Sequence, residues 1–214
     1  MRLAAADILD RPEWLRASAS KLWRHGPCCD RARTWLVAMA RSHDFAATDG
    51  LALAAPRWLT KRFQWGPTQW PIAWCQAIVA QTIDCGVFGA FSLEIFRAKG
   101  VDAYPGQVLR TYAETSTTHW RHKWAAVPEA FNWIGSRVVY HEVTVVRVGP
   151  SEARIYDPTD GVWLDPGIRD GHGAHVAVRS EAPVAVSWGK HTLVHGQWTQ
   201  IGPMPAPPRS ALGG

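Results

Sequence analysis

The chain has 214 residues, 47% of them hydrophobic, so it can bury one sizeable core and predicts a single domain over residues 1–202. The net charge is +5, but lysine and arginine are scattered and no aromatic RNA-binding motif is present, which argues against a nucleic-acid partner. No apolar run reaches the roughly 18 residues of a membrane span, and no leader-like segment opens the chain, so a cytoplasmic protein without a membrane partner is expected.

The N-terminal third predicts helices. An acidic N-cap, an early proline and a glutamate in Asp10–Glu13 predict a helix through about Arg24, which Gly26-Pro27 ends. Apolar residues at helical spacing predict a second helix over residues 30–42. From residue 56 to 71, tryptophan alternates with proline and glycine, and we expect a packed loop there.

The segment from Asp84 to Lys99 is the strongest helix in the sequence. Its apolar residues recur at three- and four-residue spacing, and Gly100 stands where a helix commonly ends. Asp84 is a plausible N-cap, which places Cys85 in the first helical turn.

Period-two patterns replace the helical ones after a mixed region. The expected strands are residues 136–148, 153–157, 175–179 and 183–188. A proline-rich tail, residues 203–214, is expected to be loose. Helices followed by strands predict an α+β domain. We expect its central helix, the one from Asp84 to Lys99, to pack on an antiparallel sheet.

The chain holds four cysteines: Cys28, Cys29, Cys75 and Cys85. Their spacing contains no C-x-x-C pair, which argues against a disulfide scaffold and a zinc site, so no metal or other cofactor is expected. Cys75 fits an apolar helix face, and Cys28-Cys29 carries no further signal.

Cys85 is the candidate nucleophile, because unpaired amides at a helix start favour a thiolate. Asp84 opposes this effect unless its side chain caps the helix.

His141 is the histidine whose position can be argued. Strand alternation places it on one face with Val139, Val143 and Val145, and places Glu142 on the other. The valine face is expected to point toward the core. If the sheet packs on the helix that begins at Cys85, a pair of thiol and imidazole becomes geometrically reasonable, with His141 as the base.

An aspartate on the next strand can orient His141. Gly149-Pro150-Ser151 predicts a hairpin turn that sets Asp157 one diagonal step from His141, on the same face. A shift of one residue in register would favour Asp160 or Asp165 instead.

Three segments carry a family resemblance: Gln81-Thr-Ile-Asp-Cys85-Gly-Val-Phe, His141-Glu-Val-Thr-Val-Val and Arg154-Ile-Tyr-Asp157-Pro-Thr. Together they resemble the papain-like superfamily, most closely its transglutaminase-like branch. The resemblance covers roughly residues 75 to 166 and implies a cysteine, a histidine and an aspartate in that order. It departs from the papain pattern, since no tryptophan follows Cys85 and a glutamate follows His141. The resemblance also implies an oxyanion hole formed by the cysteine N–H and an upstream glutamine, with Gln81 favoured over Gln76.

Two other residue sets admit weaker functional interpretations. The histidines have metal-ligand spacing in His172-x-x-His175 and His191-x-x-x-His195, although exposed loop histidines explain them better. Some of the thirteen tryptophans could bind a peptide or sugar. The first to consider are Trp74, Trp120, Trp133 and Trp163.

The sequence therefore predicts an enzyme that transfers an acyl group through Cys85, on an amide or thioester of a peptide, protein or acyl carrier. Hydrolysis and transfer to an amine, as in a transglutaminase or a biosynthetic acyltransferase, both remain open, as does the oligomeric state. The alternative is a non-catalytic module on the same fold that binds a peptide or sugar.

Overall fold

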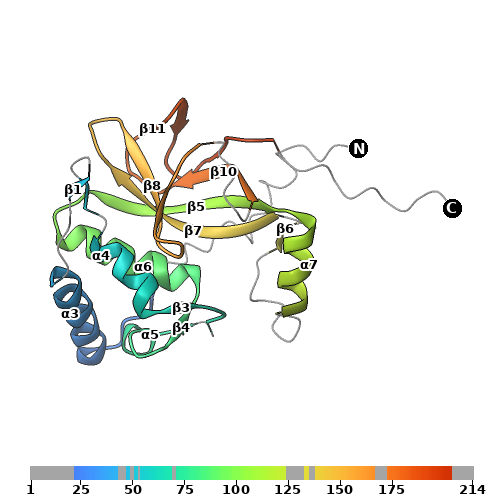
Figure 1. The fold of residues 1–214 in the computed structure, drawn as a ribbon. Coiled ribbons are helices and arrows are strands. Elements are labelled where there is room, and N and C mark those ends of the chain that lie inside the picture. The colour runs from blue at the N-terminus through green and yellow to red at the C-terminus, as the bar shows by residue number, and fades with distance from the viewer. Residues whose placement is uncertain are drawn as a thin grey trace.

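The computed structural model describes residues 22–42, 47–48, 51–52, 54–68, 71–123, 133–134, 138–166 and 173–203. This part of the chain is a mixed α+β structure with a helical layer on one face of a largely antiparallel sheet (Figure 1). The helices are α3 (Pro27–Arg41), α4 (Ala54–Arg62), α5 (Trp74–Ala77), α6 (Cys85–Ala98) and α7 (Glu114–Lys123). Among these residues, no helix is long and apolar enough to cross a membrane.

The main sheet contains seven of the described strands in the order β13-β10-β5-β7-β8-β9, with β6 also paired to β7, and all its pairs are antiparallel. Its strands are β5 (Ala103–Tyr112), β6 (Trp133–Ile134), β7 (Val138–Arg147), β8 (Ala153–Asp157), β9 (Val162–Leu164), β10 (Gly173–Ser180) and β13 (Trp198–Gln200). Three small pairs complete the described strands: β1 (Ala47–Thr48) with β2 (Leu51–Ala52), β3 (Gln64–Trp65) with β4 (Thr82–Ile83), and β11 (Val186–Trp188) with β12 (His191–Leu193).

The predicted nucleophile helix, α6, begins and ends at the expected residues. The Asp84 carboxylate accepts a hydrogen bond from the Val87 amide at 3.0 Å, which caps the first turn. At the other end Gly100 has a φ of 73°, a left-handed conformation that glycine adopts without steric cost.

Replacing Asp84 by alanine removes this cap and is expected to lower the free energy of unfolding by about 1 kcal/mol, measured by urea denaturation. Asp84→Asn is the matched control, because its amide oxygen can still accept from the Val87 amide. Its expected change is below about 0.5 kcal/mol. Equal losses in the two variants would contradict a capping role.

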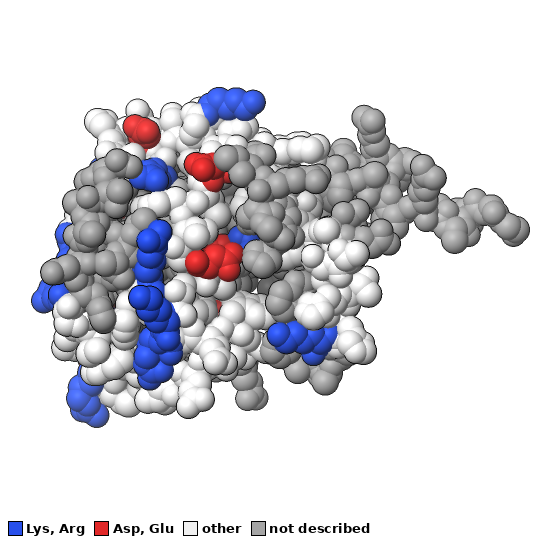
Figure 2. All heavy atoms as spheres, in the orientation of Figure 1, with Lys and Arg blue, Asp and Glu red and all other residues white. Residues whose placement is uncertain are grey.

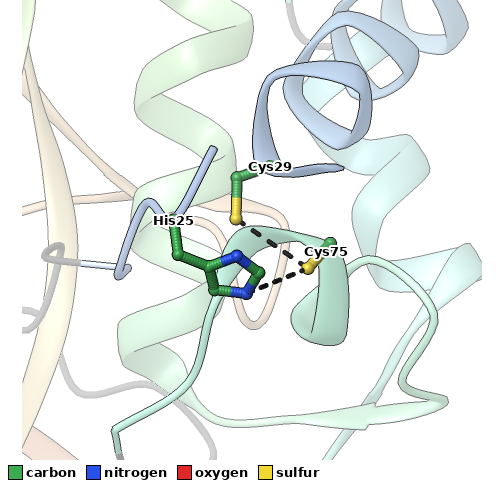
Figure 3. A group of neighbouring side chains, drawn as sticks. All are labelled: His25, Cys29 and Cys75. Atoms are coloured by element: carbon green, nitrogen blue, oxygen red, sulfur yellow. Dashed lines mark hydrogen bonds between the residues drawn. The ribbon is translucent and has the colours of Figure 1, made fainter. Parts of the chain in front are cut away.

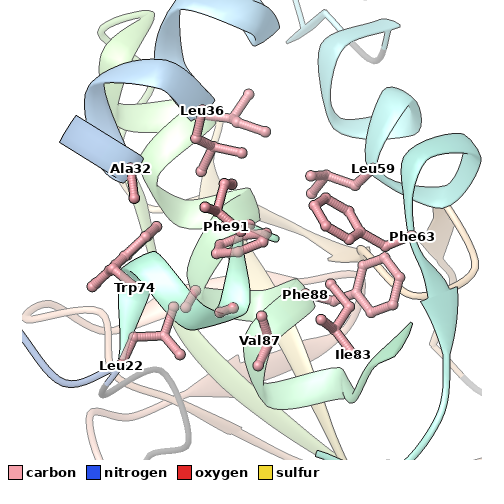
Figure 4. Close-up of a cluster of buried hydrophobic side chains, with 14 of the residues drawn as sticks. Leu22, Ala32, Leu36, Leu59, Phe63, Trp74, Ile83, Val87, Phe88 and Phe91 are labelled. Atoms are coloured by element: carbon pink, nitrogen blue, oxygen red, sulfur yellow. The ribbon is translucent and has the colours of Figure 1, made fainter. Parts of the chain in front are cut away.

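A helical core surrounds α6 on the side away from the sheet (Figure 4). Leu36 of α3 and Leu59 of α4 are fully buried there, and Phe91 of α6 packs against Phe63 and Trp74 with ring centroids 5.5 and 5.3 Å apart. The apolar residues that predicted α6 thus lie at the centre of the helical layer.

The two faces of β7 pack against different layers. Val146 lies in a cluster with Leu93 and Phe96 of α6, whereas Val143 and Val145 belong to a second cluster on the opposite face. That second cluster includes residues of β11 and β12, which form a ribbon on the far side of the sheet from the helices (Figure 1). Strand alternation separates the clusters, since neighbouring residues point to opposite faces.

Several sequence predictions agree with this fold and others do not. The helix over 30–42 is present and begins earlier, at Pro27, while the described end of the first predicted helix, residues 22–24, is not helical. The loop predicted over 56–71 is wrong, since it contains most of α4 and β3.

The strands over 136–148, 153–157 and 175–179 are present within a few residues, but the last predicted strand is shorter, at Val186–Trp188. The remainder of the first helix and the tail from residue 204 lie outside the described residues.

The charged side chains on the face shown in Figure 2 occupy several separate places. A row of basic groups lies over the helical layer, and acidic groups lie nearer the middle of the view. The described part of this face therefore does not form one continuous basic surface.

Candidate active site

His141 and Asp157 form a buried hydrogen-bonded pair. Nε2 of His141 lies 2.9 Å from Oδ2 of Asp157, and the aspartate is fully buried. The predicted register is present: the Val148 amide donates to the Glu152 carbonyl, and Thr144 lies opposite Tyr156 in the β7–β8 pair. This register brings Asp157 onto the His141 face.

Arg110 of β5 completes this pair and was missed by the sequence analysis. Its guanidinium donates to Asp157 Oδ2 at 2.6 Å and lies 3.4 Å from the carboxylate of Asp160. Its Nε lies 3.3 Å from Nε2 of His175. Arg110 is almost completely buried, like its partner Asp157. The available signal was an arginine directly after two apolar residues, Val-Leu-Arg, in a segment long enough for a strand.

These contacts fix the charge of Asp157. Burial alone would raise the pKa of its carboxyl, but the interactions with His141 and with the Arg110 guanidinium lower that pKa well below its ordinary value. An ionised carboxylate only accepts hydrogen bonds, so Nε2 of a neutral His141 carries the proton and donates it. Nδ1 is then the basic nitrogen, and it has no hydrogen-bond partner among the described residues.

Cys85 is the first residue of α6 and keeps some exposed surface. Burial raises the pKa of its thiol above the ordinary value, and the negative charges of Asp84 and Glu142 raise it further, although the Glu142 backbone amide opposes them. The expected thiolate is therefore wrong for this state, because desolvation outweighs the field of the helix start. Asp84 caps the helix as required, yet its charge still acts on the thiol.

The Cys85 thiol lies beside a stretch of β7 that has a paired strand on one side only among the described residues. On one side of this strand, Glu142 is opposite Gln107 of β5, while on the other side the pairing with β8 ends at Thr144. The Val148 amide donates to Glu152 on the β8 side, and by strand alternation the Glu142 amide points to the same side, where the pairing with β8 has ended. This places the sulfur beside the peptide bond between His141 and Glu142.

The sheet packs on the Cys85 helix, but not through the face that carries His141. Helix α6 contacts the other face of β7, where Thr144 Oγ1 donates to Ser92 Oγ at 3.0 Å. Gly89 lies so close to Glu142 that a Cβ on the glycine would be 3.6 Å from the glutamate Cβ. His141 points away from α6, and these described residues place no hydrogen bond between its imidazole and the thiol of Cys85. Strand phase identifies which residues share a face but not which face the helix covers.

Glu142, which the sequence analysis treated as structural, lies under the start of α6. Its Oε1 accepts a short hydrogen bond from the Tyr140 hydroxyl and another from Gln107 Nε2 at 3.3 Å. All three side chains are buried. The buried Glu142 carboxylate therefore lies on the α6 face of the sheet, near the Cys85 thiol.

The two candidate oxyanion glutamines lie before α6 and differ in their contacts. Gln76 Oε1 accepts from the Ala73 amide at 3.0 Å and thereby supports the start of α5. Gln81 is exposed in the bend before β4, and its carbonyl accepts from the Gln64 amide. The Gln76 side chain is thus committed to a local contact.

The other predicted residues lie in several places. Asp160 borders the buried pair through Arg110, and Asp165 is exposed after β9. His175 is buried beside Arg110, whereas His195 Nδ1 lies 3.0 Å from the Ala182 carbonyl oxygen.

Trp74 belongs to the helical core, and Trp163 packs against Phe96 and Tyr156. His172 and the side chains of Trp120 and Trp133 lie outside the described residues.

A hollow of about 770 Å³ lies between the segment before α3 and helix α6. Its lining includes Trp23, Trp74 and Glu94, and neither Cys85 nor His141 contributes to it. Glu94 is held there by Arg33, with 2.6 Å between Nη2 and the carboxylate. The hollow is thus separate from the Cys85 edge of the sheet.

Comparison with known protein families, with curated proteins and with solved structures finds no significant match. The resemblance to the papain-like superfamily is therefore a matter of residue order and spacing alone. The described structure is α+β, with helices packed on an antiparallel sheet.

Proposed function

We propose that this protein is a cysteine-nucleophile acyl-transfer enzyme with a papain-like, transglutaminase-like arrangement. The observation that carries the proposal is the buried His141–Asp157 hydrogen bond on the strand whose edge holds the Cys85 thiol. In this pair Nδ1 of His141 is the basic nitrogen, so it can accept the proton of the thiol.

The order of elements supports the same proposal. A helix that begins at Cys85 leads into β5, and the antiparallel neighbours β7 and β8 then carry His141 and Asp157. The resembling superfamily uses a cysteine, a histidine and an aspartate in this order.

The chemistry begins from a neutral thiol. When substrate binds, the Cys85 thiol approaches Nδ1 of His141 around the stretch of β7 where the pairing with β8 has ended, since catalytic hydrogen bonds often form only in the substrate complex. As the sulfur attacks the carbonyl carbon, His141 takes the thiol proton. His141 then returns that proton to the departing amine or thiol, and an acyl-Cys85 thioester remains. Asp157 holds the imidazole in the required tautomer.

The amide of Cys85 is the first oxyanion donor, because the first amides of an α-helix have no partner within the helix. Gln81 is the proposed second donor, since its side chain lies in the bend leading to β4 and α6. Substrates would be amides or thioesters of a peptide, protein or acyl carrier, with water or an amine as the final acceptor.

The test uses an activated ester, p-nitrophenyl acetate, as the acyl donor. After an acid quench, intact-mass and peptide mapping are expected to show one acetyl group on Cys85, and none there in Cys85→Ala. In His141→Gln the acetylation rate at Cys85 is expected to fall by about 100-fold, the lower part of the range for loss of a general base.

His191→Gln is the matched control, because His191 lies on β12, away from Cys85 and on the far side of the sheet from the helices. Its acetylation rate is expected to equal that of the unchanged protein. Far-ultraviolet circular dichroism checks that each variant is folded. Equal acetylation of all four cysteines, or an unchanged rate in folded His141→Gln, would contradict the enzyme and favour a non-catalytic peptide- or sugar-binding module.

A further inference from the structure

Two cysteines and a histidine from separate segments converge away from the Cys85 site (Figure 3). The Sγ atoms of Cys29 and Cys75 are 3.8 Å apart, and Nε2 of His25 is 3.5 Å from the Cys75 sulfur. All three potential ligand atoms lie within 4.8 Å of one another. The sequence analysis missed this group because 46 residues separate the two cysteines.

The backbone positions these side chains. The Trp23 amide donates to the Ile72 carbonyl at 3.0 Å, and the Trp74 amide donates to the Trp23 carbonyl at 3.2 Å. These two bonds join the segment that carries His25 to the start of α5, where Cys75 lies. The chain then turns at Gly26, whose φ is 96°, and enters α3, which presents Cys29 from its first turn.

The two distances from the Cys75 sulfur match those between ligands of a tetrahedral zinc ion. With Zn–S of about 2.3 Å and Zn–N of about 2.0 to 2.1 Å, tetrahedral angles separate two sulfurs by about 3.8 Å and a sulfur from a nitrogen by about 3.5 Å. The two measured separations, 3.8 Å and 3.5 Å, have these values. A disulfide would instead require the two sulfurs to approach to about 2.05 Å, and it would give the imidazole no role.

Cys28 supplies a further thiol next to this group. Cys28 directly precedes Cys29 at the start of α3 and is exposed, outside the group of three converging ligand atoms. It would complete the site by turning its side chain toward the bound ion.

We propose that His25, Cys29 and Cys75 bind a zinc ion, with Cys28 as the fourth ligand. Imidazole and thiolate are the ligands that structural zinc sites use, and four protein ligands close such a site. The ion would tie the segment before α3 to α5 and so stabilise the helical layer. This proposal is independent of acyl transfer at Cys85.

The experiment measures metal in the 214-residue chain purified under reducing conditions without a metal-binding tag. Elemental analysis is expected to find one zinc per chain. After chelation, titration with Co²⁺ is expected to give sulfur-to-cobalt charge-transfer absorption and the visible bands of tetrahedral cobalt. In Cys75→Ser the affinity for Co²⁺ is expected to fall at least about 10-fold, the loss that follows removal of even an outer hydrogen-bond partner of a ligand.

Cys85→Ser is the matched control, because it removes a thiol outside the group and is expected to leave the zinc content and the cobalt spectrum unchanged. His25→Ala gives a second variant, at an exposed position, and should also weaken Co²⁺ binding. The proposal is overturned if Cys75→Ser binds Co²⁺ as tightly as the unchanged chain, if no cobalt–thiolate absorption forms, or if peptide mapping finds Cys29 and Cys75 joined in a disulfide.

Discussion

Asp157→Ala is expected to lower the free energy of unfolding by about 3–5 kcal/mol, the cost of removing one partner from a buried ion pair. The substitution leaves the guanidinium of Arg110 inside the protein, 4% exposed, without its 2.6 Å carboxylate. It also removes the hydrogen-bond partner of His141 Nε2. Urea denaturation monitored by tryptophan fluorescence measures the change.

Asp160→Ala is the matched control, because Asp160 contacts the same guanidinium from a more exposed position. Its carboxylate lies 3.4 Å from Arg110 and its side chain is 35% exposed, so the expected loss is below about 1 kcal/mol. Similar losses in the two variants would show that the buried pair contributes no more than a surface pair.

The same pair gives the stability a defined pH dependence. Because the pKa of Asp157 is lowered in the folded state, its contribution is fully present above the ordinary value of 3.8. It is lost as the pH falls below that value and the folded carboxylate becomes protonated. The difference in stability between the unchanged protein and Asp157→Ala should therefore shrink on acidification.

Phe91→Ala is expected to lower the free energy of unfolding by about 3–5 kcal/mol. Phe91 is fully buried at the centre of the helical layer and packs against two rings, Phe63 and Trp74 (Figure 4). Truncation removes the apolar surface and leaves a cavity that helices on several sides cannot readily close. Thermal and urea denaturation measure the loss.

Val79→Ala is the control for this substitution, since Val79 is 73% exposed and also loses side-chain carbon atoms. Its expected change is within about 0.5 kcal/mol. A decrease of less than about 1 kcal/mol in the free energy of unfolding of Phe91→Ala would contradict this prediction. It would mean that the helical layer closes around the missing ring.

Local patterns predicted the elements that carry the candidate site. The Asp84 cap, the apolar spacing of α6 and the glycine at position 100 agree with the structure because each acts within a few residues. The hairpin that pairs β7 with β8 has the predicted register, since its short turn limits the choices. The contact between His141 and Asp157 followed from that register.

Longer-range relations could not be predicted in the same way. Strand β5 lies between β7 and β10 at the centre of the sheet, yet its mixed sequence gave no clear period and left Arg110 unnoticed. Likewise, α4 was interpreted as a loop because tryptophan, proline and glycine occur in its neighbourhood. Tertiary packing overrides such local preferences.

The sequence by itself determined that Cys85 begins a helix and that His141 and Asp157 lie on one face of adjacent strands. Only the tertiary structure decided that α6 covers the opposite face, that Glu142 lies beneath the thiol, and that burial raises the thiol pKa. It also brought His25 and Cys29 to Cys75. These differences have one physical reason. Strand alternation and helix capping depend on a few neighbouring residues, so the sequence shows them directly. The face that a helix covers and the charges around a thiol depend on distant segments, which meet only when the core forms.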